Sequence, residues 1–253
     1  DERMGPAFTL RIAGLRVRTR LTTPVTLAAI AFGIASTAGR PPRTEIAFGL
    51  LLLSAVVVAI ALHEVTRLGL YRRAGVEVRG VDLALTGGVP NLLDRTNSPR
   101  GEVAAASGGL FVTALLAGGA LAVERLTQSS GSHDVTRWIA VALGALALAQ
   151  TLPALPLDGG RLLRAFGWFL TDDPVTGSRA AAVYGHLVSA GVIVGGLLLM
   201  NAGGTFAYWG FGAVIAGMQL VTNSVSSLRD TLWQQIGGAV RLADADLPLP
   251  GRV

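Results

Sequence analysis

The sequence predicts an all-α membrane protein in which a bundle of six transmembrane helices carries a small juxtamembrane β-sheet. Of the 253 residues, 51% are hydrophobic and only 15% are charged, and the mean hydropathy is +0.54. This composition is more apolar than that of soluble domains. The apolar residues form six blocks, most of them long enough to cross a hydrocarbon core about 30 Å thick. Two segments outside the blocks alternate apolar and polar residues, which is typical of half-buried strands.

The six apolar blocks are predicted to be helices. They cover residues 24–39, 46–71, 103–123, 138–152, 180–200 and 206–223. The first and the fourth are short. Backbone amides within hydrocarbon must find hydrogen-bond partners in their own segment, so a spanning block of this length is a helix rather than a strand.

The arginines predict the orientation of these spans. All 21 basic residues are arginine, and 16 of them lie in the N-terminal stretch, the loops after the second and fourth blocks, and the C-terminal tail. Cytoplasmic loops carry the excess of positive charge, so both termini are predicted to be cytoplasmic. The basic charge suits anionic membrane lipids as partners. The sequence lacks a basic patch interleaved with aromatic residues, the pattern typical of nucleic-acid binding, so nucleic acid is not expected as a partner. With no cysteine, disulfides and thiolate ligands are excluded.

The strand-like segments lie on the predicted cytoplasmic face. One covers residues 8–12 and 15–20 with Gly14 as the break. The other is interrupted at Gly80 and ended by Gly87 and Gly88, and its apolar positions are Val76, Val78, Val81, Leu83 and Leu85. Their pairing would give a small sheet. An open edge of that sheet would accept an extended peptide, or the strands would simply cap the bundle; composition does not choose. The chain is expected to form one membrane domain, 1–225, with a short cytoplasmic tail, 226–253.

Ionisable residues within the spans are the strongest functional signal, because such groups are expensive in a bilayer and mark pairing or chemistry. The second block contains His63, Glu64 and Arg67, whose spacing directs all three side chains to one region of a helix. Asp158 follows the fourth block, just after a stretch in which Pro153 and Pro156 end the helix. The sequence therefore predicts a buried polar cluster.

These motifs resemble the site-2 proteases, the intramembrane zinc metalloproteases of peptidase family M50. That family has His-Glu-x-x-His on one helix and Asn-x-x-Pro-x-x-Pro-Leu-Asp-Gly-Gly-Arg on a later one; this chain has the stretches 63–67 and 150–161, with Asn97-Ser98-Pro99 between them. The resemblance implies a six-helix bundle in a bacterial inner membrane. It also implies zinc ligands at His63 and Asp158, with Glu64 as the general base.

Three departures from the family pattern decide the predicted function. Arg67 occupies the position of the second zinc histidine, Gln150 that of the asparagine, and Gly109 that of a proline. An arginine offers no lone pair and cannot bind zinc. We therefore expect no tight zinc, and hypothesise that Arg67 replaces the charge of the metal and holds Glu64 and Asp158 as a buried ion triad.

Two other histidines are candidate substitute ligands. His133 is expected in an outer, solvated loop, and His186, in the fifth block, is the only plausible replacement. The favoured function is an inactive homologue that acts as a scaffold, subunit or binding partner of another membrane protein. The alternative is a working zinc endopeptidase with an altered metal site that cleaves transmembrane substrates. A transporter has little support, since no pair of matching broken helices is present.

Overall fold

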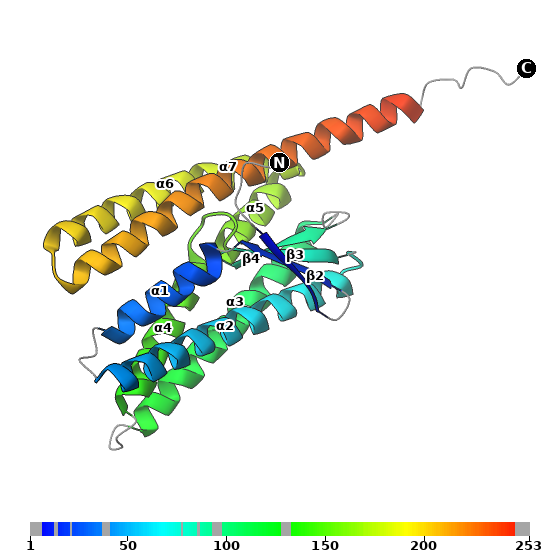
Figure 1. Cartoon of the computed structure of the whole chain (residues 1–253). Helices are drawn as coiled ribbons and strands as arrows, with labels where there is room; N and C mark the ends of the chain where they lie inside the picture. Colours follow the sequence, from blue (N-terminus) through cyan, green and yellow to red (C-terminus); the bar gives the residue numbers. More distant parts are fainter. Residues whose placement is uncertain are drawn as a thin grey trace, which may run out of the picture.

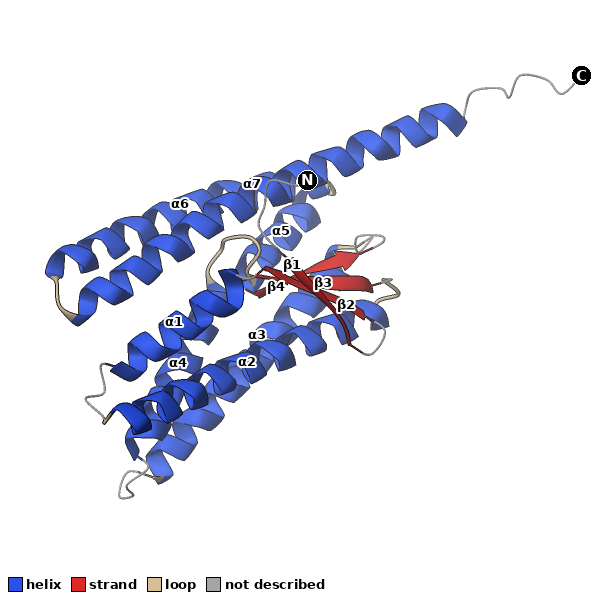
Figure 2. Cartoon of the chain, viewed as in Figure 1, coloured by secondary structure: helices blue, strands red, loops and turns tan. Residues whose placement is uncertain are grey.

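The computed structural model describes most of the chain as helix, with one small sheet (Figures 1 and 2). The residues described are 7–12, 15–20, 22–36, 41–76, 78–84, 87–92, 98–127 and 133–245. The helices are α1 (Thr22–Ser36), α2 (Pro42–Arg73), α3 (Pro99–Leu126), α4 (His133–Thr151), α5 (Asp158–Thr171), α6 (Pro174–Ala202) and α7 (Thr205–Ala245). The strands are β1 (Ala7–Ile12), β2 (Leu15–Arg20), β3 (Val78–Ala84) and β4 (Gly87–Leu92).

Each of the six predicted blocks coincides largely with a helix, but the number of spans stays a prediction. Among the described residues, three helices are long and apolar enough to cross a membrane, namely Arg43–Arg73, Pro99–Leu126 and Pro174–Ala202. By contrast, α1 has 15 residues and is about 22 Å long, which is shorter than a hydrocarbon core of about 30 Å. The chain is thus a helical membrane protein with at least these three candidate spans.

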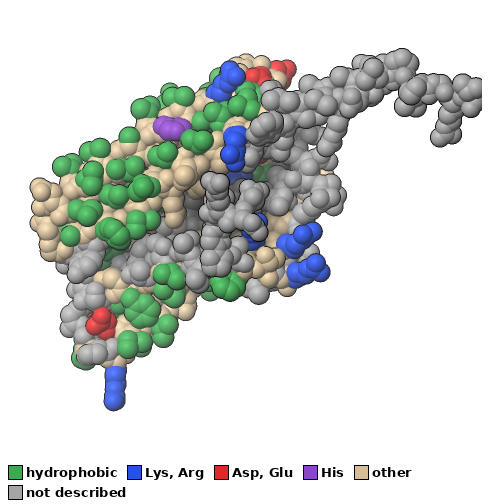
Figure 3. Space-filling view, turned by 45° about the horizontal axis from the view of Figure 1, so that its top comes forward, with side chains coloured by type: hydrophobic (Ala, Val, Ile, Leu, Met, Phe, Trp, Pro, Cys, Tyr) green, Lys and Arg blue, Asp and Glu red, His purple; other side chains and the backbone are tan. Residues whose placement is uncertain are grey.

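The surface of the helices agrees with a lipid environment. Large apolar side chains on α6 are exposed, among them Val183, Leu187 and Leu198. Figure 3 shows a broad face of the molecule covered by apolar side chains, with arginine and acidic side chains toward its margins. Soluble monomers rarely expose apolar patches of this kind, whereas a bilayer covers them.

Helix α5 was not predicted. The prolines between Thr151 and Asp158 do end α4, but the chain then begins a new helix at Asp158. One face of α5 buries Asp158, Arg161 and Arg164 while Phe166, Phe169 and Leu170 are exposed. At 14 residues, or about 21 Å, α5 is too short to cross a membrane.

The four strands form one sheet in the order β1-β2-β3-β4. β1 and β2 are antiparallel, β2 and β3 parallel, and β3 and β4 antiparallel. The strands predicted for 8–12 and 15–20 are confirmed, as is pairing with the segment after Val76. The strand after Val76 ends before Gly87 and Gly88, as expected, but these glycines then pair with Ala84 and Leu83 and begin β4, which was not predicted. Leu85, which was also assigned to the strand, lies outside the described residues.

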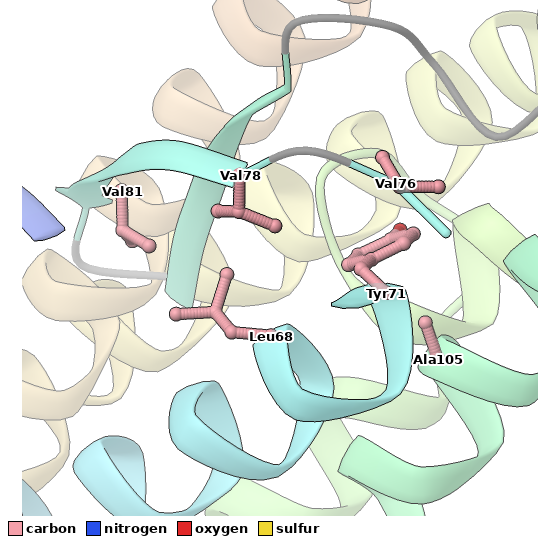
Figure 4. Packing of buried hydrophobic residues seen from close by; sticks show 6 residues of the cluster. All are labelled: Leu68, Tyr71, Val76, Val78, Val81 and Ala105. Atoms are coloured by element: carbon pink, nitrogen blue, oxygen red, sulfur yellow. The ribbon is translucent and has the colours of Figure 1, made fainter. Parts of the chain in front are cut away.

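A compact apolar cluster attaches the sheet to the end of α2 (Figure 4). It consists of Leu68, Tyr71, Val76, Val78, Val81 and Ala105. Immediately after α2, Gly75 has φ +79°, a backbone conformation that glycine adopts without strain. The chain therefore turns at once into the sheet, which comes to lie beside the end of α2 and the beginning of α3.

Helices α6 and α7 form a closely packed hairpin. A Cβ atom at Gly196 would lie 2.7 Å from the Gly210 carbonyl oxygen and 2.9 Å from Val214 Cγ2. At the start of α6, Asp173 caps the helix by accepting bonds from the Thr176 hydroxyl and the Val175 and Thr176 amides, and these bonds lower the pKa of its carboxyl. α7 continues to Ala245, so the expected tail boundary at residue 226 falls inside this helix.

The glycine contact between α6 and α7 gives a stability test with a matched control. Gly196→Ala should lower the thermal stability of the detergent-solubilised protein by roughly 1–3 kcal/mol, because its methyl group would overlap α7. Gly195→Ala should be neutral or slightly stabilising, since no atom lies within 4 Å of a Cβ there and alanine favours helix. Equal melting temperatures for the two variants would contradict the packing described.

Candidate functional site

The predicted polar cluster exists and is fully buried. His63, Glu64 and Arg67 lie within little more than one turn of α2, and Asp158 is the first residue of α5. Their exposed fractions are 2%, 4%, 1% and 0%, respectively. Because the periodicity of α2 places the first three on one side, the break between α4 and α5 needs to bring only Asp158 to them.

The guanidinium of Arg67 contacts both carboxylates. Its Nη2 forms an ion pair with Glu64 Oε2, and its Nη1 lies 3.5 Å from Asp158 Oδ1. A buried cation is stable only if counter-charges offset its lost hydration, and these two groups supply them. The structure thus contains the ion triad that the sequence predicted.

The imidazole of His63 completes the cluster on the side of α3. His63 Nε2 lies 3.3 Å from Asp158 Oδ2 and 3.8 Å from Glu64 Oε1. On the other edge of the ring, Nδ1 lies 2.8 Å from the Thr113 hydroxyl oxygen. Two tetrahedral zinc ligands with bonds near 2.1 Å would be separated by about 3.4 Å. His63 and Asp158 therefore keep the separation of a ligand pair.

The full residue set nevertheless does not fit a catalytic zinc ion. Such a site takes three protein ligands and leaves a fourth position for water. Here the third position belongs to Arg67, which has no lone pair to donate and already supplies positive charge to both carboxylates. A divalent ion added beside this guanidinium would meet like-charge repulsion in a region of low dielectric constant.

A second buried ion cluster adjoins the first along α5. Glu102, in the first turn of α3, pairs with Arg164 at 3.0 Å and approaches Arg161 at 3.8 Å. Arg161 also donates to the Tyr71 hydroxyl and to the Pro156 carbonyl oxygen. The two clusters together hold three guanidiniums and three carboxylates, so their formal charges balance among these described residues.

The remaining predicted residues lie on α4 and α6. Gln150 is buried near the end of α4. His186 is exposed on α6, and its Nδ1 lies 2.6 Å from the carbonyl oxygen of Ala182 in the same helix, so it does not join His63. His133 is not in a loop, because α4 begins at this residue; the placement of its side chain lies outside the description.

Sequence reasoning missed Thr113 and the pairing of Glu102 with two arginines. A threonine in an apolar helix commonly bonds a carbonyl one turn earlier, so nothing in the sequence distinguished Thr113. Glu102 offered a better signal, since a carboxylate at the start of a candidate span needs a partner. Its partners, Arg161 and Arg164, could not be recognised because they lie on α5, a helix that was not predicted.

Comparisons with known proteins place these features in context. No protein-family model matches the chain. A Mycobacterium tuberculosis protein named "Putative zinc metalloprotease Rip3" is 31% identical over 194 residues, which are 75% of this chain and 49% of that protein. The Synechocystis protein "Putative zinc metalloprotease sll0528" is 30% identical over 203 residues, 78% of this chain and 51% of that protein. The chain therefore spans about half the length of these relatives.

A solved structure shares the fold. The site-2 protease from Methanocaldococcus jannaschii superposes with a TM-score of 0.64 at 20% identity, covering 85% of this chain and 95% of that one. At this level of identity the likeness concerns the arrangement of helices and strands.

The ion triad predicts a large stability difference between two arginines of the same helix. Arg67→Ala should lower the free energy of unfolding in detergent by about 3–5 kcal/mol, because it leaves two buried carboxylates without their cation. Arg72→Ala, at the exposed end of α2, should change it by no more than about 0.5 kcal/mol. If thermal unfolding shows the same small change for both variants, Arg67 does not neutralise the cluster.

Proposed function

Because this chain belongs to the site-2 protease family, we propose that it is a non-catalytic member that works by binding. In this proposal it is a scaffold or subunit for another membrane protein in a bacterial inner membrane. It crosses that membrane several times, contacts lipid along its helices, and keeps both termini in the cytoplasm. Nucleic acid is not a partner.

One observation carries the proposal: the Arg67 guanidinium lies where a third zinc ligand is needed and contacts Glu64 and Asp158. Arginine remains protonated under all physiological conditions, so the position cannot become a ligand by losing a proton. Glu64, the general base of the family, is paired with this cation and has no metal-activated water to deprotonate. The cluster keeps the helices together without supplying the chemistry of hydrolysis.

The sheet supports a binding role. Its outer strands, β1 and β4, each pair with only one neighbour among the described strands. Free edges of this kind accept an extended segment of another chain through backbone hydrogen bonds. An edge beside the end of α2 would allow a juxtamembrane segment of a single-span protein to be held without being cut.

A second candidate function is a working intramembrane zinc endopeptidase with an altered metal site. The observation that favours it is the 3.3 Å separation of His63 Nε2 and Asp158 Oδ2, which suits two ligands of one ion. Glu64 would remain the base. This candidate requires either a two-ligand zinc site or a rearrangement that moves Arg67 away from both carboxylates.

Metal content separates the two candidates. The purified, unaltered protein should contain zinc well below one ion per chain after dialysis, because losing one ligand weakens binding by orders of magnitude. Arg67→His should raise zinc content toward one per chain, and the double variant Arg67→His/Asp158→Ala should lose it again. Mass spectrometric metal analysis makes the measurement. Stoichiometric zinc in the unaltered protein, removed by Asp158→Ala, would instead establish the endopeptidase candidate.

The scaffold role predicts a defined partner. The full chain purified in mild detergent from its native membrane should co-migrate with one other membrane protein at a fixed ratio in size-exclusion chromatography. That complex should persist in Glu64→Gln, since binding does not use the base. Cleavage of a single-span reporter helix by the unaltered chain, but not by Glu64→Gln, would refute the non-catalytic assignment. Recovery of the chain alone as a monodisperse species would refute the scaffold role.

A further inference from the structure

Helix α3 contributes two residues to the cluster, and both contact the ring of His63 or its partner. Thr113 is 1% exposed, and its hydroxyl oxygen lies 2.8 Å from His63 Nδ1. The same hydroxyl donates to the carbonyl oxygen of Gly109, one turn earlier, at 2.9 Å. Gly109 faces His63 and Asp158 with its hydrogen atom in place of a side chain.

The single proton of the Thr113 hydroxyl limits which ring nitrogen of His63 carries a proton. A threonine hydroxyl has one proton, and a carbonyl oxygen can only accept. The geometry directs the single Thr113 proton to the Gly109 carbonyl, which has no other way to bond this hydroxyl, and the Thr113 oxygen then accepts from His63 Nδ1–H. We propose that Thr113 is a positioning residue that fixes His63 in the tautomer protonated at Nδ1, leaving the Nε2 lone pair free.

The surroundings of Nε2 agree with this tautomer. Although Asp158 Oδ2 is 3.3 Å away, His63 Nε2 forms no hydrogen bond to any described residue. If Nε2 carried the proton, a carboxylate at this distance would be expected to accept it with good geometry. A neutral imidazole with Nδ1–H held by a fixed partner and Nε2 free is the form in which histidine binds metals.

Gly109 provides the space that this arrangement needs. A Cβ atom at position 109 would overlap Asp158 Oδ2, and it would lie 2.7 Å from His63 Cε1 and 3.0 Å from His63 Nε2. Both side chains are buried and cannot simply turn away. Glycine therefore lets the backbone of α3 approach closely enough for Thr113 to reach Nδ1 while Asp158 stays beside Nε2.

The inference goes beyond the proposed function, because it holds whether or not the unaltered chain binds zinc. It means that the Nε2 lone pair of His63 is preorganised from α3 for a metal ion, although Arg67 occupies the position of another ligand. A borderline divalent ion such as zinc would then be accepted once that position carries a histidine.

Nitrogen-15 NMR of the full chain in detergent micelles, labelled at histidine, tests the tautomer directly. Only three histidines are present, and His63→Gln identifies the signals of His63. The unaltered protein should show His63 protonated at Nδ1 and unprotonated at Nε2. Thr113→Val, which conserves shape but removes the acceptor, should move the proton to Nε2, where Asp158 can accept it; Thr113→Ser should restore the original pattern. Protonation at Nε2 in the unaltered protein, or no change in Thr113→Val, would overturn the inference.

Zinc affinity in an Arg67→His background supplies a second readout. Thr113→Val should weaken zinc binding there by about 10–100-fold, the usual effect of removing the partner of a metal-bound histidine, and Thr113→Ser should recover most of it. Equal affinity for the valine and serine variants would count against positioning by Thr113. If Arg67→His binds no zinc, the explanation of the inactive site by residue 67 fails, while the tautomer measurement still decides the role of Thr113.

Discussion

The structure depends on the compensation of charge in a region from which water is excluded. Arg67 lies against Glu64 and Asp158, and Arg161 and Arg164 lie against Glu102, all of them buried. A single charge left uncompensated in such a place costs several kcal/mol, which is a large part of the net stability of a domain. The helices that carry these groups, α2, α3 and α5, are therefore held to positions in which every charge finds its partner.

This requirement explains several features that have no obvious purpose when taken alone. The chain interrupts its helix between Thr151 and Asp158 so that a carboxylate can reach α2. Arg161, one turn further along α5, donates to the Tyr71 hydroxyl, and Tyr71 belongs to the apolar cluster that seats the sheet. The network thus connects the sheet on one side with the cluster of His63, Glu64, Arg67 and Asp158 on the other.

The features that could be predicted from the sequence are those whose pattern lies within a single helix or strand. The cluster on α2 follows from helical period alone, and β1 and β2 follow from strict alternation. β4 was missed because Gly87 and Gly88 are usually terminators, yet here they begin a hairpin strand whose pairing is set by β3. α5 was missed because its buried face is charged. Its arginines Arg161 and Arg164 are explained only by their pairing with Glu102, 59 and 62 residues earlier in the chain. Thr113 acquires its role solely from a histidine on another helix.

The identity of residue 67 determines whether the cluster needs a metal to be stable. With histidine at this position, Glu64 and Asp158 would have no internal cation, and a bound divalent ion would have to offset their charge. A neutral apolar residue would leave both buried carboxylates without a counter-charge, so nothing would offset the free energy lost with their hydration. Arginine carries the compensating positive charge on its own side chain and keeps it at physiological pH. Arginine at this position therefore makes the charge balance of the cluster independent of a metal, so His63, Glu64 and Asp158 can lie together in the fold without one.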